Sequence, residues 1–190
     1  MKYDHDQHHR RSIRLKGYDY SQDGAYFVTI CVDRRECLFG DVVDGQMRLN
    51  KYGAIVAEEW QRSSVIRREI ELDAWVVMPN HFHGIVIIDI PVGSNGNNHV
   101  GANDRSPLRD YTHPRMKPKS LSSLMAGFKS VVTKEINILR DAPGTKLWQR
   151  NYYEHIIRNQ DAMDKIRRYI VNNPLSWSID QLHPDNPSKW

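Results

Sequence analysis

Two histidines separated by one residue are the first feature of the sequence that could do chemistry. His81 and His83 flank Phe82 in the apolar segment HFHGIVII, which is typical of a β-strand. Residues i and i+2 of a strand share a face, so the two imidazoles project side by side. A divalent metal ion would satisfy both buried rings, because neutral histidine is a common metal ligand. Alternatively, each ring has its own hydrogen-bond partner. The HxHxH pattern is excluded, because residue 85 is Ile.

A tyrosine and an asparagine share one face of a predicted helix over residues 160–173. Tyr169 and Asn173 are four residues apart, and Ala162 and Ile166 fall on the same arc. We therefore expect this face to point inward, where a phenol and a carboxamide need polar partners. The alternative is a core tyrosine with a bonded hydroxyl and an asparagine that caps the helix before Pro174.

Aromatic and basic residues are interleaved in the segment LWQRNYYEHIIRN, residues 147–159. Such a stretch can stack on bases and hold phosphates. The alternative is a core strand followed by a helix cap. The residues concerned are Trp148, Arg150, Tyr152, Tyr153, His155 and Arg158.

The elements that must position these residues follow from periodicity. Strands are predicted over 25–32, 72–78 and 81–88, and the last two, apolar on both faces, are placed centrally in a sheet. Residues 44–50 form a hairpin arm. Helices are predicted over 51–63, over 120–140 with a serine cap, and over 160–173 with Asn159 as N-cap. Gly127 is expected to mark a close approach, and Pro174 ends the last helix. This order favours an α+β fold with a mainly antiparallel sheet.

Length and composition bound the remaining organisation. The 190 residues, 39% of them hydrophobic, are enough for one domain. We expect a basic arm over 1–24, whose His5, His8 and His9 belong to a disordered terminus, with metal binding by these histidines as the alternative. The domain spans 25–178 with a long loop at 91–118, and a polar tail covers 179–190. The absence of a long apolar run argues against a membrane span, and two cysteines argue for the reducing cytoplasm.

The charge distribution points to a polyanion. The net charge is only +4, but residues 101–150 hold ten Lys or Arg against four Asp or Glu, and RRSIRLK near the N-terminus carries four positive charges and no acid. Nucleic acid is the first candidate partner, and solvated surface charge is the alternative.

Taken together, these motifs resemble a known family. The segments DAWVVMPNHFHGIVII, WQRNYYEHIIRN and IRRYIVNNP are similar to those of single-tyrosine HUH transposases, and more narrowly of the REP-associated tyrosine transposases related to insertion sequence 200. HHRRSIRLKGYDYSQDGAYFVTI and FKSVVTKEIN are also similar, so the resemblance spans about residues 9–178. It implies the HUH endonuclease fold, a ferredoxin-like, mainly antiparallel sheet with helices packed on one face. It also implies that the tyrosine helix crosses the face that bears the histidines.

The resemblance also implies an activity and its residues. Tyr169 matches the nucleophile that cleaves and rejoins single-stranded hairpin DNA through a 5′-phosphotyrosine. His81, His83 and Asn173 match the ligands of Mg²⁺ or Mn²⁺, which polarises the scissile phosphate. Tyr152 and Tyr153 rank second as nucleophiles, since they lack the helical partner.

The expected partner is a palindromic single-stranded DNA hairpin, and the protein is expected to act as a monomer or homodimer. The residues predicted to touch DNA are Arg10, Arg11, Arg14, Lys16, Lys117, Lys119, Lys129, Lys134, Trp148, Arg150 and Tyr152. One rival reading is a domesticated hairpin-binding protein without cleavage. Another is a hydrolytic metalloenzyme, which would need a third strong ligand and a base.

Overall fold

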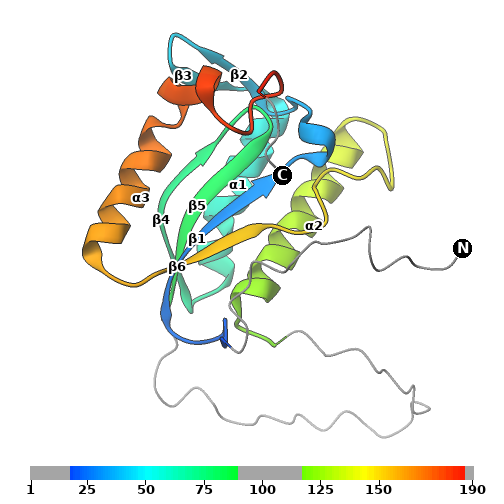
Figure 1. Cartoon of the computed structure of the whole chain (residues 1–190). Coiled ribbons are helices and arrows are strands. Elements are labelled where there is room, and N and C mark those ends of the chain that lie inside the picture. Colours follow the sequence, from blue (N-terminus) through cyan, green and yellow to red (C-terminus); the bar gives the residue numbers. More distant parts are fainter. Residues whose placement is uncertain (1–17, 90–116, 187–190) are drawn as a thin grey trace, which may run out of the picture.

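The computed structural model of the chain describes residues 18–89 and 117–186 (Figure 1). Arg10, Arg11, Arg14 and Lys16, most of the predicted arm and nearly all of the 91–118 loop lie outside the described residues. None of the helices in the described ranges combines the length and hydrophobicity that a membrane span requires.

An antiparallel four-stranded sheet forms the centre of the fold. Its strands are β1 (Gly24–Cys31), β4 (Ile70–Val77), β5 (His81–Ile88) and β6 (Tyr153–Ile157), in the order β4-β5-β1-β6. Helix α1 (Lys51–Ile66) connects β1 to β4, and α2 (Leu121–Leu139) connects β5 to β6. This is the ferredoxin-like arrangement, so the predicted α+β fold is confirmed. The hairpin β2 (Gly40–Val43) and β3 (Gln46–Leu49) precedes α1.

Helices α1 and α2 cover one face of the sheet with an aromatic core (Figure 1). The Trp60 ring of α1 lies 4.5 Å from Phe82 of β5 and 5.2 Å from Phe128 of α2, measured between centroids. Gly84 of β5 makes room for this contact, because a Cβ there would come within 2.7 Å of the Trp60 ring. Large rings on two helices therefore close over a strand position that has no side chain.

The third helix, α3 (Gln160–Asn172), packs on the opposite face of the sheet. Its Ile170 is buried with Phe27 of β1 and Ile85 of β5. The predicted packing of helices on one face is confirmed for α1 and α2, and α3 covers the opposite face. The strands are apolar on both sides, and each side needs a cover. The implied placement of the tyrosine helix over the histidine-bearing face is confirmed.

Strand β4 lies at the edge of the sheet, so its predicted central position is wrong, whereas β5 is central as predicted. The physical reason is that α1 and α3 both contact β4, one from each side. An edge strand covered in this way can be apolar on both faces.

The helix boundaries follow the predicted caps closely. Ser120 caps α2 by accepting a hydrogen bond from the Ser123 amide, and the Asn159 side chain accepts one from the Ala162 amide at the start of α3. Two details differ from expectation. Asn173 keeps helical dihedral angles, because Pro174 begins a 3-10 helix (Pro174–Ile179) as its first residue. Gly127 is not a close approach, since a Cβ there would meet nothing within 4 Å.

Candidate metal and nucleophile site

The two histidines lie on β5, on the face that α3 covers. Alternation along the strand sends Phe82 and Gly84 into the aromatic core, and His81 and His83 to the other side. Both imidazoles are buried, with their centroids 4.6 Å apart. The predicted side-by-side projection is therefore confirmed.

Asn80 sets the tautomer of His81. The amide nitrogen of Asn80 donates hydrogen bonds to the carbonyl oxygens of Leu182, at 2.8 Å, and Arg35, at 3.1 Å. The amide oxygen is therefore the atom that faces His81 Nδ1 at 2.8 Å, and Nδ1 must carry the proton. This leaves the Nε2 lone pair of His81 free to bind a ligand.

His83 contacts the tyrosine of α3. Its Nδ1 lies 2.8 Å from Thr29 Oγ1 on β1, and its Nε2 lies 3.2 Å from the Tyr169 hydroxyl oxygen. With the tyrosine hydroxyl donating, Nε2 accepts and the Nδ1 proton goes to Thr29. Strands β1 and β5 and helix α3 thus converge on one imidazole.

The helix face predicted to point inward is only partly buried. Asn173 is buried, but 45% of the Tyr169 surface remains exposed, so the expectation that the tyrosine faces away from solvent is wrong. The ring packs against Phe27 and His83, and one edge of it stays exposed.

An ion pair holds α3 on the sheet. Arg167, two residues before Tyr169, makes two hydrogen bonds, of 2.6 and 2.9 Å, to the Asp73 carboxylate of β4.

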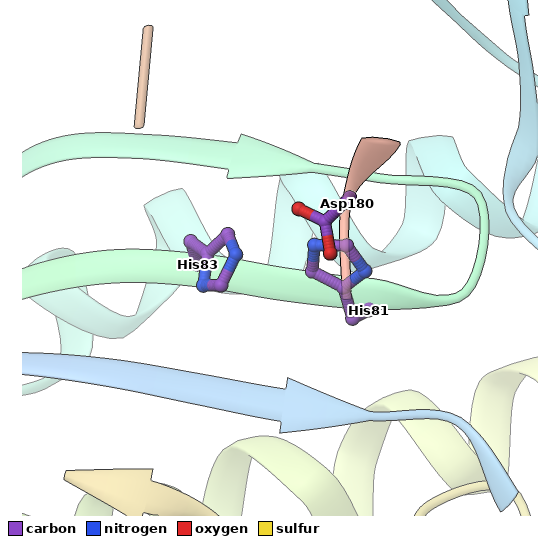
Figure 2. A group of neighbouring side chains, drawn as sticks. All are labelled: His81, His83 and Asp180. Carbon is purple, nitrogen blue, oxygen red and sulfur yellow. The ribbon is translucent and has the colours of Figure 1, made fainter. Parts of the chain in front are cut away.

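Asp180 is a candidate site residue that the sequence analysis missed. It follows the 3-10 helix, in the segment predicted to be a polar tail, and its carboxylate returns to the histidines (Figure 2). The ligand atoms of Asp180, His81 and His83 all lie within 4.8 Å of one another. The Asn173 amide nitrogen donates to Asp180 Oδ2 at 3.2 Å, and the Leu182 amide donates to Oδ1 at 2.6 Å. The only sequence signal was an acidic residue shortly after the tyrosine helix.

Burial controls the protonation of this cluster. Desolvation lowers the pKa of His81 to about 4, even though the Asp180 charge opposes the shift, and it lowers the pKa of His83 well below its ordinary value. Burial, followed by the negative charge of Asp180, raises the pKa of Tyr169 to about 12. Both imidazoles are therefore neutral near pH 7, and the phenol keeps its proton.

The cluster fits a divalent metal ion. His81 Nε2 and Asn173 Oδ1 are buried acceptors without a hydrogen-bond partner among the described residues. Two neutral imidazoles, one carboxylate and one amide oxygen form a mixed nitrogen and oxygen donor set suited to a first-row divalent ion. A cation would also offset the negative charge of the half-buried Asp180.

The site opens into a cavity of about 630 Å³. Its lining includes Thr29, His83 and Tyr169, together with residues 149–153 and 179–182. Arg150 supplies a cationic side chain to this lining. The cavity therefore combines a phenol, a candidate metal site and a positive charge.

The interleaved segment divides between the core and the cavity. Trp148 is only 4% exposed and packs 5.3 Å from the Phe39 ring, so its predicted stacking on DNA bases is wrong. The neighbouring Leu147 side chain is buried as well. Tyr152 and Tyr153 line the cavity, but Tyr169 is the tyrosine whose hydroxyl contacts His83.

The predicted lysines have different surroundings. Lys129 is half-buried and donates to the carbonyl oxygen of Gln149 at 2.7 Å. Lys117 pairs with Asp19 at 2.8 Å. Lys119 and Lys134 are exposed.

A search of solved structures finds a protein with the same fold. The chain matches the structure of a REP-associated tyrosine transposase bound to a REP hairpin, with a TM-score of 0.55 and 19% sequence identity, over 94% of this chain and 91% of that chain. The chain therefore has the fold of the REP-associated tyrosine transposases, as the sequence motifs indicated.

A sequence relative is more similar. A protein of Haemophilus influenzae, described as an uncharacterized protein, is 40% identical over 185 residues, which cover 97% of this chain and 98% of the relative. The chain belongs to the same family as this protein. No protein-family model matches the chain.

Proposed function

We propose that the protein is a tyrosine transposase, a metal-dependent endonuclease and strand transferase acting on single-stranded DNA. The observation that carries this proposal is the Tyr169 hydroxyl, 3.2 Å from His83 Nε2 and beside the cluster of His81, His83 and Asp180. The cavity in front of the hydroxyl leaves room for a phosphodiester, and the fold is that of a known transposase.

The proposed metal is Mg²⁺ or Mn²⁺, held by His81, His83 and Asp180, with Asn173 supplying an amide oxygen. At His83 Nε2 the ion would take the place of the Tyr169 hydroxyl proton. When bound, such an ion neutralises phosphate charge and favours the ionised phenol. Mg²⁺ prefers oxygen ligands, so the substrate phosphate and water would complete the set. Asp180 strengthens the case, because the set expected from the sequence contained no charged ligand.

The proposed reaction transfers a phosphoryl group to tyrosine. The Tyr169 oxygen forms a bond to phosphorus, the bond from phosphorus to the 3′ oxygen breaks, and the leaving oxygen takes a proton to become a free 3′-OH. With a pKa of about 12, only about one Tyr169 in 10⁵ is ionised at pH 7, so the site must favour the phenolate. The 5′-phosphotyrosine conserves the bond energy, and the 3′-OH of another strand can rejoin it.

The proposed substrate is a single-stranded hairpin of palindromic repeat DNA. The transposase with the same fold is described as bound to a REP hairpin, and the charge distribution of this chain also favours DNA.

The proposed active unit is a monomer, because His81, His83, Tyr169 and Asp180 all come from one chain. The proposed compartment is the cytoplasm, where Cys31 and Cys37 remain thiols.

A covalent-trapping assay tests the proposal. Labelled single-stranded hairpins from the flanks of the coding sequence are incubated with protein and Mn²⁺ or Mg²⁺, and denaturing gels resolve any protein–DNA adduct. We expect an adduct with wild type that disappears with EDTA, in Tyr169→Phe and in His81→Ala/His83→Ala. Tyr152→Phe and Tyr153→Phe serve as matched controls and should keep the adduct.

Other outcomes would identify the rival functions. An adduct that survives Tyr169→Phe would move the nucleophile, with Tyr152 and Tyr153 next in line. Hairpin binding without any adduct, after unrelated hairpins have been tried, would indicate a DNA-binding protein without cleavage. Metal-dependent hydrolysis that survives Tyr169→Phe would indicate a hydrolytic metalloenzyme.

A further inference from the structure

A second concave surface lies outside the candidate site, along α2. This groove has a volume of about 960 Å³ and is bounded by the exposed side of α2 from residue 126 to residue 138 and by the segment 141–150. It does not include His81, His83, Tyr169 or Asp180. The proposed chemistry therefore does not account for it.

The floor of the groove is formed by small side chains, and its rim is basic. Ala126, Ser130 and Thr133 follow one another along α2 at helical spacing and keep the floor low. The basic residues on its lining are Lys129, Lys134, Lys146 and Arg150. Asp141 is the acidic residue on the same lining, and Lys146 also pairs with Asp33 beside it, but four basic residues against these two acids leave positive charge dominant. A groove of this kind complements a chain that carries regularly spaced negative charges.

The groove adjoins the cavity of the candidate site. Gln149 and Arg150 line both concave surfaces, so this short segment is the wall between them. The Lys129 ammonium on α2 donates to the Gln149 carbonyl oxygen at 2.7 Å and holds this wall against the helix. A polymer that occupies the catalytic cavity can therefore pass Arg150 and enter the groove without leaving a basic surface.

We propose that the α2 groove binds the sugar–phosphate backbone of the single-stranded DNA that continues from the catalytic cavity. This inference rests on the proposed function and adds a second contact region for the same strand. Sugars and bases lie over the small residues of the floor, and phosphates face Lys134, Lys146 and Arg150. An acidic peptide would satisfy the same charges, but the position next to the proposed phosphodiester-cleaving site favours DNA.

The test measures binding of a 24-nucleotide oligo(dT) to the full chain by fluorescence anisotropy, in EDTA so that no cleavage occurs. Lys134→Glu, on the rim, and Ser130→Glu, on the floor, are compared with Arg68→Glu, an exposed arginine of the α1–β4 turn that does not line the groove. We expect each groove variant to weaken binding about tenfold, and Lys134→Glu to lower the salt slope by about 0.7. Arg68→Glu should bind within about twofold of wild type. Equal unfolding temperatures will show that the variants are folded.

Several results would overturn the inference. Wild-type affinity in both groove variants, or an equal loss in Arg68→Glu, would show that the groove does not hold DNA. If Lys134→Glu loses binding of a poly-glutamate peptide but keeps binding of oligo(dT), the occupant is an acidic peptide. If the wild type still forms the covalent adduct, these results would contradict only the proposed DNA binding in the groove, not the proposed function. If the wild type neither binds oligo(dT) nor forms an adduct, both the proposed function and the proposed DNA binding in the groove are contradicted.

Discussion

Asn80 decides which nitrogen of His81 faces the site. Its amide nitrogen donates to two carbonyl oxygens while its amide oxygen accepts from the His81 ring. One of the two carbonyls belongs to Leu182, two residues after Asp180. A single side chain therefore orients a histidine and anchors the segment that carries the carboxylate. Partners of this kind fix both the tautomer and the geometry of a metal ligand.

Replacing Asn80 should therefore damage metal binding without removing a ligand. In Asn80→Ala the His81 Nδ1 proton loses its acceptor and the Leu182 carbonyl loses its donor, and we expect the affinity for Mn²⁺ to fall about tenfold. Isothermal titration calorimetry measures the change, with Asn172→Ala, an exposed residue of α3, as the control. Unchanged Mn²⁺ affinity in Asn80→Ala would show that Asn80 does not position the site.

The buried histidines should make the metal-free protein sensitive to acid. The unfolded chain takes up a proton at His81 below pH 6.5, whereas the folded chain resists until about pH 4, so stability is lost as the pH falls between these values. His83 acts in the same direction. From His81 alone the loss reaches about 3 kcal/mol.

Urea unfolding in EDTA between pH 7 and pH 4 measures this loss. In His81→Gln/His83→Gln, neither site gains a proton on unfolding, so the pH dependence should flatten. An equally steep pH dependence in the double variant would assign the acid sensitivity to other groups.

The sequence identified those site residues whose spacing matches the repeat of a strand or of a helix. His81 and His83 follow the two-residue repeat of a strand, and Tyr169 and Asn173 follow the turn of a helix. Asp180 obeys neither period, because it reaches the site through a 3-10 helix and a bend held by Asn80 and Asn173. Such a placement depends on tertiary contacts that single-sequence patterns do not contain.

At the level of elements, the packing of α1 against β5 depends on the missing side chain of Gly84. In Gly84→Ala the added methyl would meet Trp60 and Phe82 at 2.7 and 2.9 Å, and we expect a loss of about 1–3 kcal/mol in the free energy of unfolding. Gly127→Ala is the matched control. It lies in α2 with open space around it and should gain about 0.5–1 kcal/mol.

Urea unfolding of both glycine variants tests this difference in sign. Equal stabilities of Gly84→Ala and wild type would mean that the Trp60 ring can shift without cost. A loss of stability in Gly127→Ala would show that α2 is crowded at that position after all.

Element types were predictable because composition and caps agree locally, as Ser120 and Asn159 illustrate. The order of the strands in the sheet, and the face of the sheet that each helix covers, were less predictable from the sequence. Strand β4 has the apolar character of a central strand although it lies at the edge, because helices cover it from both sides. Trp148 belongs to an interleaved segment that resembles a DNA-binding surface, yet its ring fills the space beside Phe39. Both errors arise because a sequence shows that a residue is apolar or aromatic but not which surface it meets.

For the molecule as a whole, the excess of basic over acidic residues should make DNA binding strongly dependent on salt. Each phosphate neutralised on a single strand contributes about 0.7 to the slope of log affinity against log salt concentration. With Lys134, Lys146 and Arg150 in contact, we expect a slope steeper than about −2. Anisotropy titrations of wild type between about 50 and 200 mM NaCl measure it. A slope near zero would show that contacts other than phosphates dominate binding.

The order in which the ligands occur along the chain has a consequence for biosynthesis. His81 and His83 emerge from the ribosome early, the tyrosine helix follows much later, and Asp180 emerges after both. A nascent chain, or a product of a message truncated within the α3 region, carries the histidines but lacks the carboxylate. The complete donor set therefore forms only after translation has passed residue 180, and unfinished polypeptides cannot assemble it.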